Sequence, residues 1–117
     1  DKIMNEVCVF LADGFEEIEG LTVVDLLRRA GEEVETVSIM GRKMIEGSHK
    51  IKVEADALFE ETDFTEGKML VLPGGMPGTR HLGAYKPLTD MLCDWEQKEN
   101  NWQQSVRHHL YLADLAF

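Results

Sequence analysis

The chain has 117 residues, 44% of them hydrophobic and 29% charged, which suits one folded domain and is too short for two. Its 22 acidic and 12 basic residues give a formal net charge of -10. That charge repels nucleic-acid phosphates and anionic lipids, so we expect neither nucleic acid nor a membrane as partner. No apolar run approaches the ~20 residues of a membrane span, and no signal peptide is evident. We therefore expect a cytoplasmic protein, with residues 1–3 as a leader and Met4 as a candidate start.

The first part of the chain predicts a strand, a helix and a second strand. The apolar run 7–12 is typical of a strand buried on both faces, and it ends at Asp13. Across 15–30, apolar residues recur at helical spacing, with acidic residues in the first turn and basic residues in the last. Gly31 is a typical helix stop. The β-branched segment 34–40 predicts the second strand, and together they form a βαβ unit.

The middle of the chain predicts peripheral structure. Alternating apolar and polar residues over 44–54 indicate a short exposed hairpin or an edge strand. The segment 56–66 is a polar connection, and we expect Leu58, Phe59 and Phe64 to anchor it to the core.

The remaining segments predict one more strand and one more helix. The apolar run 69–72 is a second doubly buried strand, which stops at Pro73-Gly74-Gly75. The segment 87–95 predicts an amphipathic helix. Residues 102–117 show neither a clean strand period nor a clean helix period.

Two of these segments are candidates for a site. Ligands of open parallel α/β sheets bind beyond the carboxyl ends of the strands, so we expect 13–19 and Pro73-Gly74-Gly75 to face one crevice. The backbone N–H groups of Gly74 and Gly75 are candidate donors to a developing oxyanion. The alternative is that the two glycines only form a tight turn that needs positive φ.

Acidic side chains stand at the start of the predicted helix. Glu19 is a candidate general acid or base at the mouth of the crevice. The alternative for Glu19 is that it only complements the helix dipole, and we assign that role alone to Glu16 and Glu17.

The cysteines and histidines give weaker signals. Cys8 and Cys93 have no disulfide or zinc spacing, and we expect both to be reduced, buried, unreactive thiols. His108-His109 lacks a further ligand at metal spacing and is assigned to an exposed tail. His49 and His81 fall in predicted loops, and His81 is a candidate to line the crevice. Dinucleotide-binding, Walker and nucleophile-elbow motifs are absent from the sequence, so we expect no cofactor and no metal.

Three segments together resemble the ThiJ/PfpI family: FLADGFEEIE at 10–19, VDLLRRAG at 24–31 and VLPGG at 71–75. The resemblance extends from Glu6 to Glu99. It implies a flavodoxin-like three-layer α/β fold with a mostly parallel sheet, similar to class I glutamine amidotransferases and usually dimeric. It also implies a reactive cysteine on a strand-to-helix elbow. Members act as glyoxalases or proposed deglycases, as redox-sensing chaperones in stress responses, or as peptidases and amidases.

The resemblance assigns roles to three residues and shows one departure. Glu19 matches the acid that hydrogen-bonds the cysteine, and Gly74 and Gly75 match the backbone donors around it. The cysteine is expected soon after Asn101, and it is absent. When each codon boundary is moved by one base, residues 103–106 can encode Ala-Ala-Val-Cys, and the rest can encode an elbow and its helix. We therefore interpret 1–101 as the N-terminal part of a family domain and 102–117 as a frameshifted tail, with the C-terminal part of the fold missing.

We expect this truncated chain to be inactive, because no thiolate would stand beside Glu19 to attack an aldehyde carbonyl. The missing strands would leave a sheet edge uncovered, so we expect a homo-oligomer, with Leu110, Leu112, Leu115 and Phe117 covering part of that edge. Two alternatives stay open. One is a binding or regulatory module that takes a small aldehyde or anion at Gly74 and Gly75; the other is a cysteine-free enzyme that uses Glu19 and His81.

Overall fold

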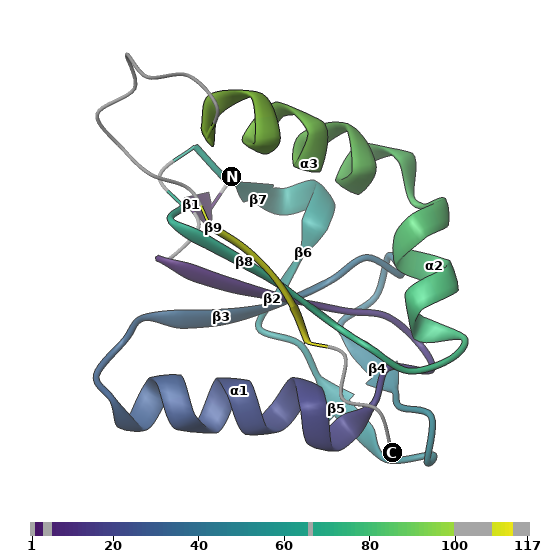
Figure 1. Ribbon diagram of the computed structural model, residues 1–117. Coiled ribbons are helices and arrows are strands. Elements are labelled where there is room, and N and C mark those ends of the chain that lie inside the picture. Colours follow the sequence, from purple (N-terminus) through teal and green to yellow (C-terminus); the bar gives the residue numbers. More distant parts are fainter. Residues whose placement is uncertain (1, 4–5, 66, 100–108, 114–117) are drawn as a thin grey trace.

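The computed structural model describes residues 2–3, 6–65, 67–99 and 109–113. A five-stranded, fully parallel sheet lies between helices on its two faces (Figure 1). This arrangement confirms the predicted flavodoxin-like three-layer α/β fold. The strands follow the order β6 (Ala57–Leu58), β3 (Val34–Ser38), β2 (Val7–Leu11), β8 (Met69–Pro73) and β9 (His109–Ala113).

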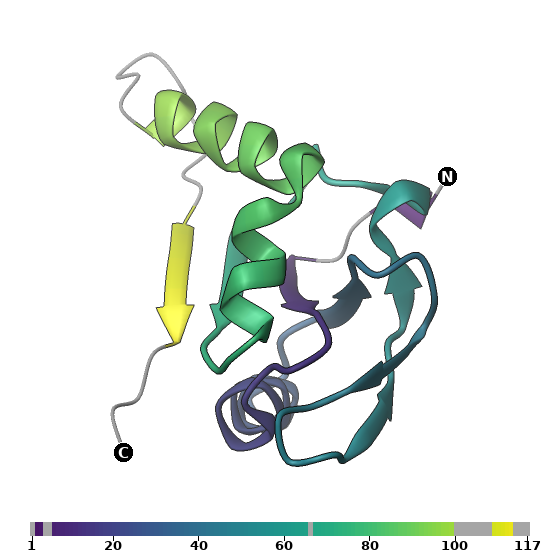
Figure 2. The ribbon, with the colours of Figure 1, turned by 90° about the vertical axis from the view of Figure 1, so that its right-hand side faces the viewer.

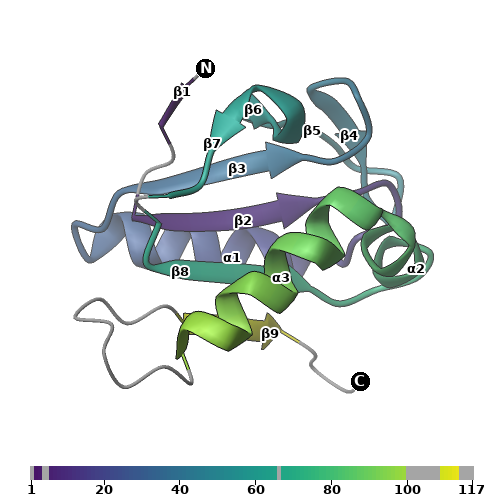
Figure 3. The same cartoon turned by 90° about the horizontal axis from the view of Figure 1, so that it is seen from above.

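The central strand β2 is apolar throughout because both of its faces are covered. Helix α1 (Glu17–Arg29) lies on one face, and α2 (Gly78–Ala84) and α3 (Lys86–Glu99) lie on the other (Figure 3). Val9 belongs to the buried cluster that includes Val24 of α1. The next residue, Phe10, belongs to the opposite cluster with Leu82 of α2 and Leu88 of α3. Alternate side chains of β2 therefore enter two separate cores.

Helix α1 begins and ends where its local chemistry predicts. The Glu16 carboxylate caps the helix by accepting the Ile18 N–H at 2.8 Å. Arg28 and Arg29 occupy the last turn, where the helix dipole favours positive charge. Gly31 follows with φ +87°, a conformation that glycine adopts at little cost.

Two small sheets stand beside the main one. Strands β4 (Met44–Glu46) and β5 (Lys52–Glu54) form the predicted hairpin, which is antiparallel. Figures 2 and 3 show this hairpin and β9 at opposite edges of the molecule. Strand β1 (Lys2–Ile3) pairs with β7 (Thr62–Asp63) in parallel, so residues 2–3 have a structural role that the sequence did not indicate.

The connection after the hairpin contains short elements that periodicity does not detect. Strand β6 adds two residues to the edge of the main sheet, and the 3-10 turn η1 (Phe59–Glu61) follows it. Two of the three predicted anchors are confirmed, since the ring centroids of Phe59 and Phe64 lie 6.0 and 5.7 Å from that of Phe10, whereas Leu58 is a half-buried residue of β6. Helix α2 was not predicted either. It has only seven residues, two of them glycine, so it is too short to show a clear helical pattern of apolar residues.

Part of the C-terminal segment joins the main sheet as β9. This strand runs parallel to β8, with Leu110 opposite Leu70 and Ala113 opposite Pro73. The assignment of His109 to a tail outside the fold is therefore wrong, because its backbone belongs to the sheet; His108 lies outside the described residues. Cover of the β8 edge is confirmed for Leu110 and Leu112, whereas Leu115 and Phe117 lie outside the described residues.

Among the helices that the structure describes, none combines the length and apolarity needed to cross a bilayer.

Candidate functional site

Two loops meet at the C-terminal end of the central strands. The loop after β2 leads into α1, and the loop after β8 carries the glycine turn. The Glu16 N–H donates to the Gly74 carbonyl at 2.9 Å, which joins the two loops. The hairpin β4–β5 closes the same end of the sheet, since the Ser48 N–H donates to the Phe15 carbonyl at 2.8 Å. The segments 13–19 and 73–75 therefore lie together, as the parallel topology predicts.

Glu19 reaches this junction from the first turn of α1. Its side chain is buried, with 4% of the residue exposed, and its Oε1 accepts the Gly74 N–H at 3.1 Å. A buried carboxylate needs a donor to offset its lost hydration, and Gly74 supplies one. This N–H was a candidate for an open oxyanion donor. In the structure it faces the Glu19 carboxylate instead, so a ligand would have to displace Glu19 to use it.

Gly75 adopts the conformation that the tight-turn alternative requires. Its φ is +101°, where side chains other than hydrogen are strained. A Cβ on Gly75 would lie 2.5 Å from the Glu16 backbone nitrogen, far inside van der Waals contact. The close approach of the two loops therefore demands glycine here whether or not the site binds a ligand.

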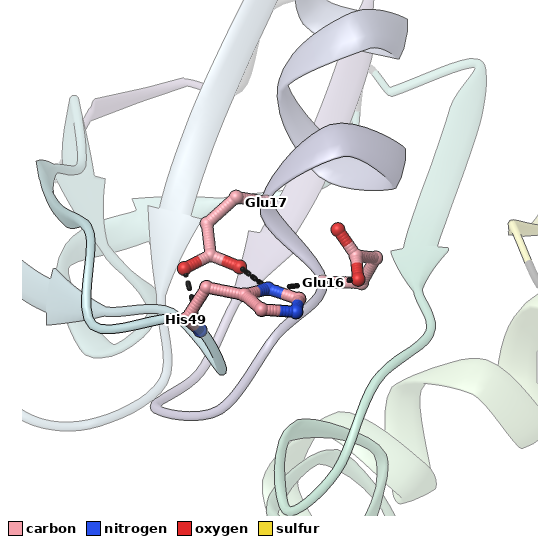
Figure 4. A group of neighbouring side chains, drawn as sticks. All are labelled: Glu16, Glu17 and His49. Atoms are coloured by element: carbon pink, nitrogen blue, oxygen red, sulfur yellow. Dashed lines mark hydrogen bonds and ion pairs between the residues drawn. The ribbon is translucent and has the colours of Figure 1, made fainter.

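Glu17 joins α1 to the hairpin turn through several hydrogen bonds, and Figure 4 shows its contacts with His49. The residue is 3% exposed. Its Oε1 accepts from the His49 ring Nδ1 at 2.8 Å, and its Oε2 accepts the His49 N–H at 2.8 Å and the Ile51 N–H at 3.3 Å. The prediction that Glu17 only complements the helix dipole is wrong, because this carboxylate holds the hairpin turn against α1. No sequence signal links Glu17 to His49, which lies 32 residues away.

The contacts shift the pKa values of both partners. Burial raises the pKa of Glu17, but hydrogen bonds from the His49 ring and from nearby backbone N–H groups outweigh it and bring the pKa to about 2. The same hydrogen bond, with the negative charges of Glu17 and Glu16, raises the pKa of His49. An ionised Glu17 is therefore the form that the fold stabilises.

Both cysteines of the chain lie on the other side of the sheet from α1. Cys8 is fully buried in β2 among the residues packed against α2 and α3. Burial raises the pKa of its thiol well above the usual value, and the negative charge of Glu35 adds to this. Cys93 is on α3 and is exposed, which corrects the prediction that both thiols are buried. Neither thiol stands beside Glu19.

His81 is also apart from the Glu19 junction. It lies on α2 and lines a shallow hollow of about 270 Å³ with Ile39, Met40, Ala84 and Tyr85. Because α1 and α2 cover opposite faces of the sheet, the structure does not bring Glu19 and His81 together as an acid–base pair.

A wider groove of about 570 Å³ opens between the hairpin and the loop after β2. Asp13 lies on one wall and pairs with Arg42, and this hydrogen-bonded contact lowers the pKa of the Asp13 carboxyl. Lys50 and Lys52 of the hairpin line the groove with Met44 and Met76. The groove therefore mixes both charges with exposed apolar side chains and shows no preference for one class of ligand.

A sequence model described as the DJ-1/PfpI family matches residues 5–104. The chain belongs to the DJ-1/PfpI family. This confirms the resemblance drawn from the three sequence segments. The match includes the whole junction of Glu19 with the glycine turn.

Individual members of the DJ-1/PfpI family are similar over much of the chain. The DJ-1 homolog B of Arabidopsis thaliana is 32% identical over 82% of this chain and 22% of its own length. A deglycase of Thermococcus kodakarensis is 39% identical over 60% of this chain and 42% of its own length. The crystal structure of a mutant DJ-1 superfamily protein from Salmonella typhimurium superposes with a TM-score of 0.72 and 31% identity, covering 80% of this chain and 51% of that one. The chain thus spans about half or less of the length of these relatives.

Proposed function

We propose that this chain carries the carboxylic-acid and backbone-amide part of a DJ-1/PfpI-type site, and that as a 117-residue polypeptide it performs no cysteine-dependent chemistry. The observation that carries this proposal is the buried pair of Glu19 and Gly74, with both thiols of the chain placed elsewhere. Cys8 is buried in the core on the α2 and α3 side of the sheet, and Cys93 is exposed on α3. A thiolate must touch its substrate to attack it.

The position of β9 supports the same proposal. The family resemblance places a nucleophile on the elbow after a strand, close to the acid and the glycine turn. Strand β9 lies next to β8, and the pairing of Ala113 with Pro73 brings its C-terminal end level with that turn. Neither its sequence, HLYLA, nor the DLAF sequence that follows it contains a cysteine, serine or threonine.

In a full-length relative of this chain we propose the chemistry of a cysteine-dependent glyoxalase or deglycase. The thiolate would form a bond to the carbonyl carbon of a small aldehyde, and the carbonyl oxygen would take up the electron pair and then a proton. Glu19 is the candidate to exchange such a proton because its carboxyl lies against the glycine turn at the C-terminal end of the sheet. The similarity to an archaeal deglycase supports this choice of reaction class.

We also propose that residues 102–117 come from a shifted reading frame. The family match ends at residue 104, close to the point where the alternative frame begins to encode the missing cysteine motif. Sequencing the genomic locus tests this. Codons for residues 103–106 that cannot encode Ala-Ala-Val-Cys in the shifted frame would rule it out.

An assay with methylglyoxal tests the proposed inactivity. We expect turnover by the purified chain to equal that of its Glu19→Gln variant prepared in parallel. Turnover that iodoacetamide abolishes would show an active thiol and overturn the proposal. Turnover that survives alkylation but is lost in Glu19→Gln would instead support a cysteine-free enzyme.

Small-anion binding at the glycine turn is less favoured by the geometry. The Gly74 N–H already serves Glu19, and the carboxylates of Glu16 and Glu19 bring negative charge to the same junction. An anion would meet repulsion there before it met a donor. A rise in Tm when small carboxylates or phosphate are added, if it is absent in the Gly75→Ala variant, would favour anion binding at the glycine turn instead.

We propose that the chain self-associates. Strand β9 covers the edge of β8, but its own outer edge has no strand partner within residues 2–3, 6–65, 67–99 and 109–113. Unpaired strand edges promote association. Light scattering coupled to size exclusion should give a mass above that of one chain, and a single monomeric species at micromolar concentration would contradict this.

A further inference from the structure

Three metal-ligating side chains converge where α1 meets the hairpin. Glu16 and Glu17 precede and begin the helix, and His49 comes from the hairpin turn. Each offers one ligand atom, and these atoms all lie within 4.8 Å of one another. Figure 4 shows the imidazole between the two carboxylates. The set thus combines nitrogen and oxygen donors from two segments that only the fold brings together.

Each carboxylate is oriented by backbone N–H groups through one oxygen and presents the other to the imidazole. Glu17 uses Oε2 for the His49 and Ile51 N–H groups, and Glu16 uses Oε1 for the Ile18 N–H. The remaining oxygens, Oε1 of Glu17 and Oε2 of Glu16, lie 2.8 and 3.8 Å from His49 Nδ1. Hydrogen bonds that hold the ligands from behind are a regular feature of metal sites.

These separations fit a metal with small adjustments. Ligand atoms that bind one Zn²⁺ at about 2.0–2.1 Å in a tetrahedral arrangement stand roughly 3.3 Å apart. The two separations from His49 Nδ1 lie on either side of that value, and all three ligand atoms lie within 4.8 Å of one another, so modest side-chain rotations bring them into a shared coordination sphere.

We propose that Glu16, Glu17 and His49 bind one divalent transition-metal ion of the Zn²⁺ type. Two carboxylates and a neutral imidazole together neutralise a divalent charge, and this mixture of donors suits Zn²⁺ or Co²⁺ better than the hard cations Mg²⁺ and Ca²⁺. The His49 side chain is 65% exposed, which leaves an entry path and room for water in the remaining coordination positions. The ion would link the hairpin turn to the N-terminal end of α1. This site needs no thiol and is independent of the function proposed above.

Titration of the chelator-treated full chain with Zn²⁺ and with Co²⁺ tests the site. We expect one Zn²⁺ per chain by calorimetry, visible d–d bands with Co²⁺, and a Tm raised by roughly 5 °C or more at saturating Zn²⁺. Two variants each remove one ligand. His49→Ala deletes the imidazole at an exposed position, and Glu16→Gln keeps an oxygen that can still cap the Ile18 N–H.

We expect each ligand variant to weaken Zn²⁺ binding at least about 10-fold. Glu54→Gln, which removes an exposed acid from β5, and His109→Ala, which removes another imidazole, should bind like the parent chain. Two results would overturn the proposal: the absence of saturable one-to-one binding, or binding that His49→Ala and Glu16→Gln leave unchanged. Loss of binding in His109→Ala would also overturn it, by placing the ion elsewhere.

Discussion

The Glu19 carboxylate and the Gly74 backbone N–H, 55 residues apart in the chain, are joined by a hydrogen bond of 3.1 Å. The bond forms because β2 and β8 are parallel neighbours, so the loops that follow them leave the sheet at the same end. Helix α1 then turns back along one face and carries Glu19 under the glycine turn. This contact links the buried acid of α1 to the glycine turn, and neither cysteine of the chain takes part in it.

Replacing Glu19 should separate its structural role from its charge. Glu19→Ala leaves the Gly74 N–H without an acceptor in a buried place, so we expect a loss of roughly 1–3 kcal/mol of unfolding free energy. Glu19→Gln keeps an acceptor oxygen and should cost clearly less. Urea unfolding followed by circular dichroism measures both values. Equal losses in the two variants would show that the hydrogen bond to Gly74 is not what the side chain contributes.

Two glycines offer a matched pair of substitutions with opposite expected signs. Gly75→Ala introduces a side chain at φ +101° and against the Glu16 backbone, and should cost at least about 2 kcal/mol. Gly83→Ala on α2 meets no atom within 4 Å and should stabilise the fold by about 0.5–1 kcal/mol. Thermal unfolding of the two variants and of the parent chain measures both changes in stability. A neutral Gly75→Ala would contradict the close approach of the two loops.

Asp56 should make stability depend on acid pH. Burial raises its pKa, but hydrogen bonds from the backbone and side chain of Thr36, aided by Arg28, outweigh burial and lower the pKa below its usual value. Because the folded pKa is the lower one, the contribution is present above the unfolded pKa and is lost as pH falls through the folded pKa. We expect the urea midpoint of the parent to fall between pH 5 and about 3 more steeply than that of Asp56→Asn. Parallel curves for the two proteins would refute this.

Thiol labelling should distinguish the two cysteines. Cys93 is exposed and should react quickly with Ellman's reagent, whereas Cys8 is fully buried with a raised pKa and should react only when the chain unfolds. The native chain should therefore show one fast thiol and the denatured chain two. A Cys93→Ser variant should lose the fast phase. A fast phase that persists in Cys93→Ser would show that Cys8 is accessible, and the proposed inactivity would need a new basis.

Much of this protein follows from local pattern in its sequence. The run 7–12 is apolar at every position because its strand contributes to two cores, and that requirement leaves a readable signature. Helix α1 carries its cap and charges within its own residues. The motifs around Glu19 and Gly74 were sufficient to indicate the family, and the parallel topology was sufficient to expect their convergence.

Other features depend on pairing between distant residues, and no local pattern records them. Glu17 looks like an ordinary acid of a first helical turn until the hairpin brings the His49 ring and two backbone N–H groups to its carboxylate. Strand β9 has no period of its own, and its place is set by the free hydrogen-bonding edge of β8. Which acceptor faces the Gly74 N–H, and which acids are buried, were decided by tertiary structure, because burial and hydrogen-bond partners arise only when separate segments pack together.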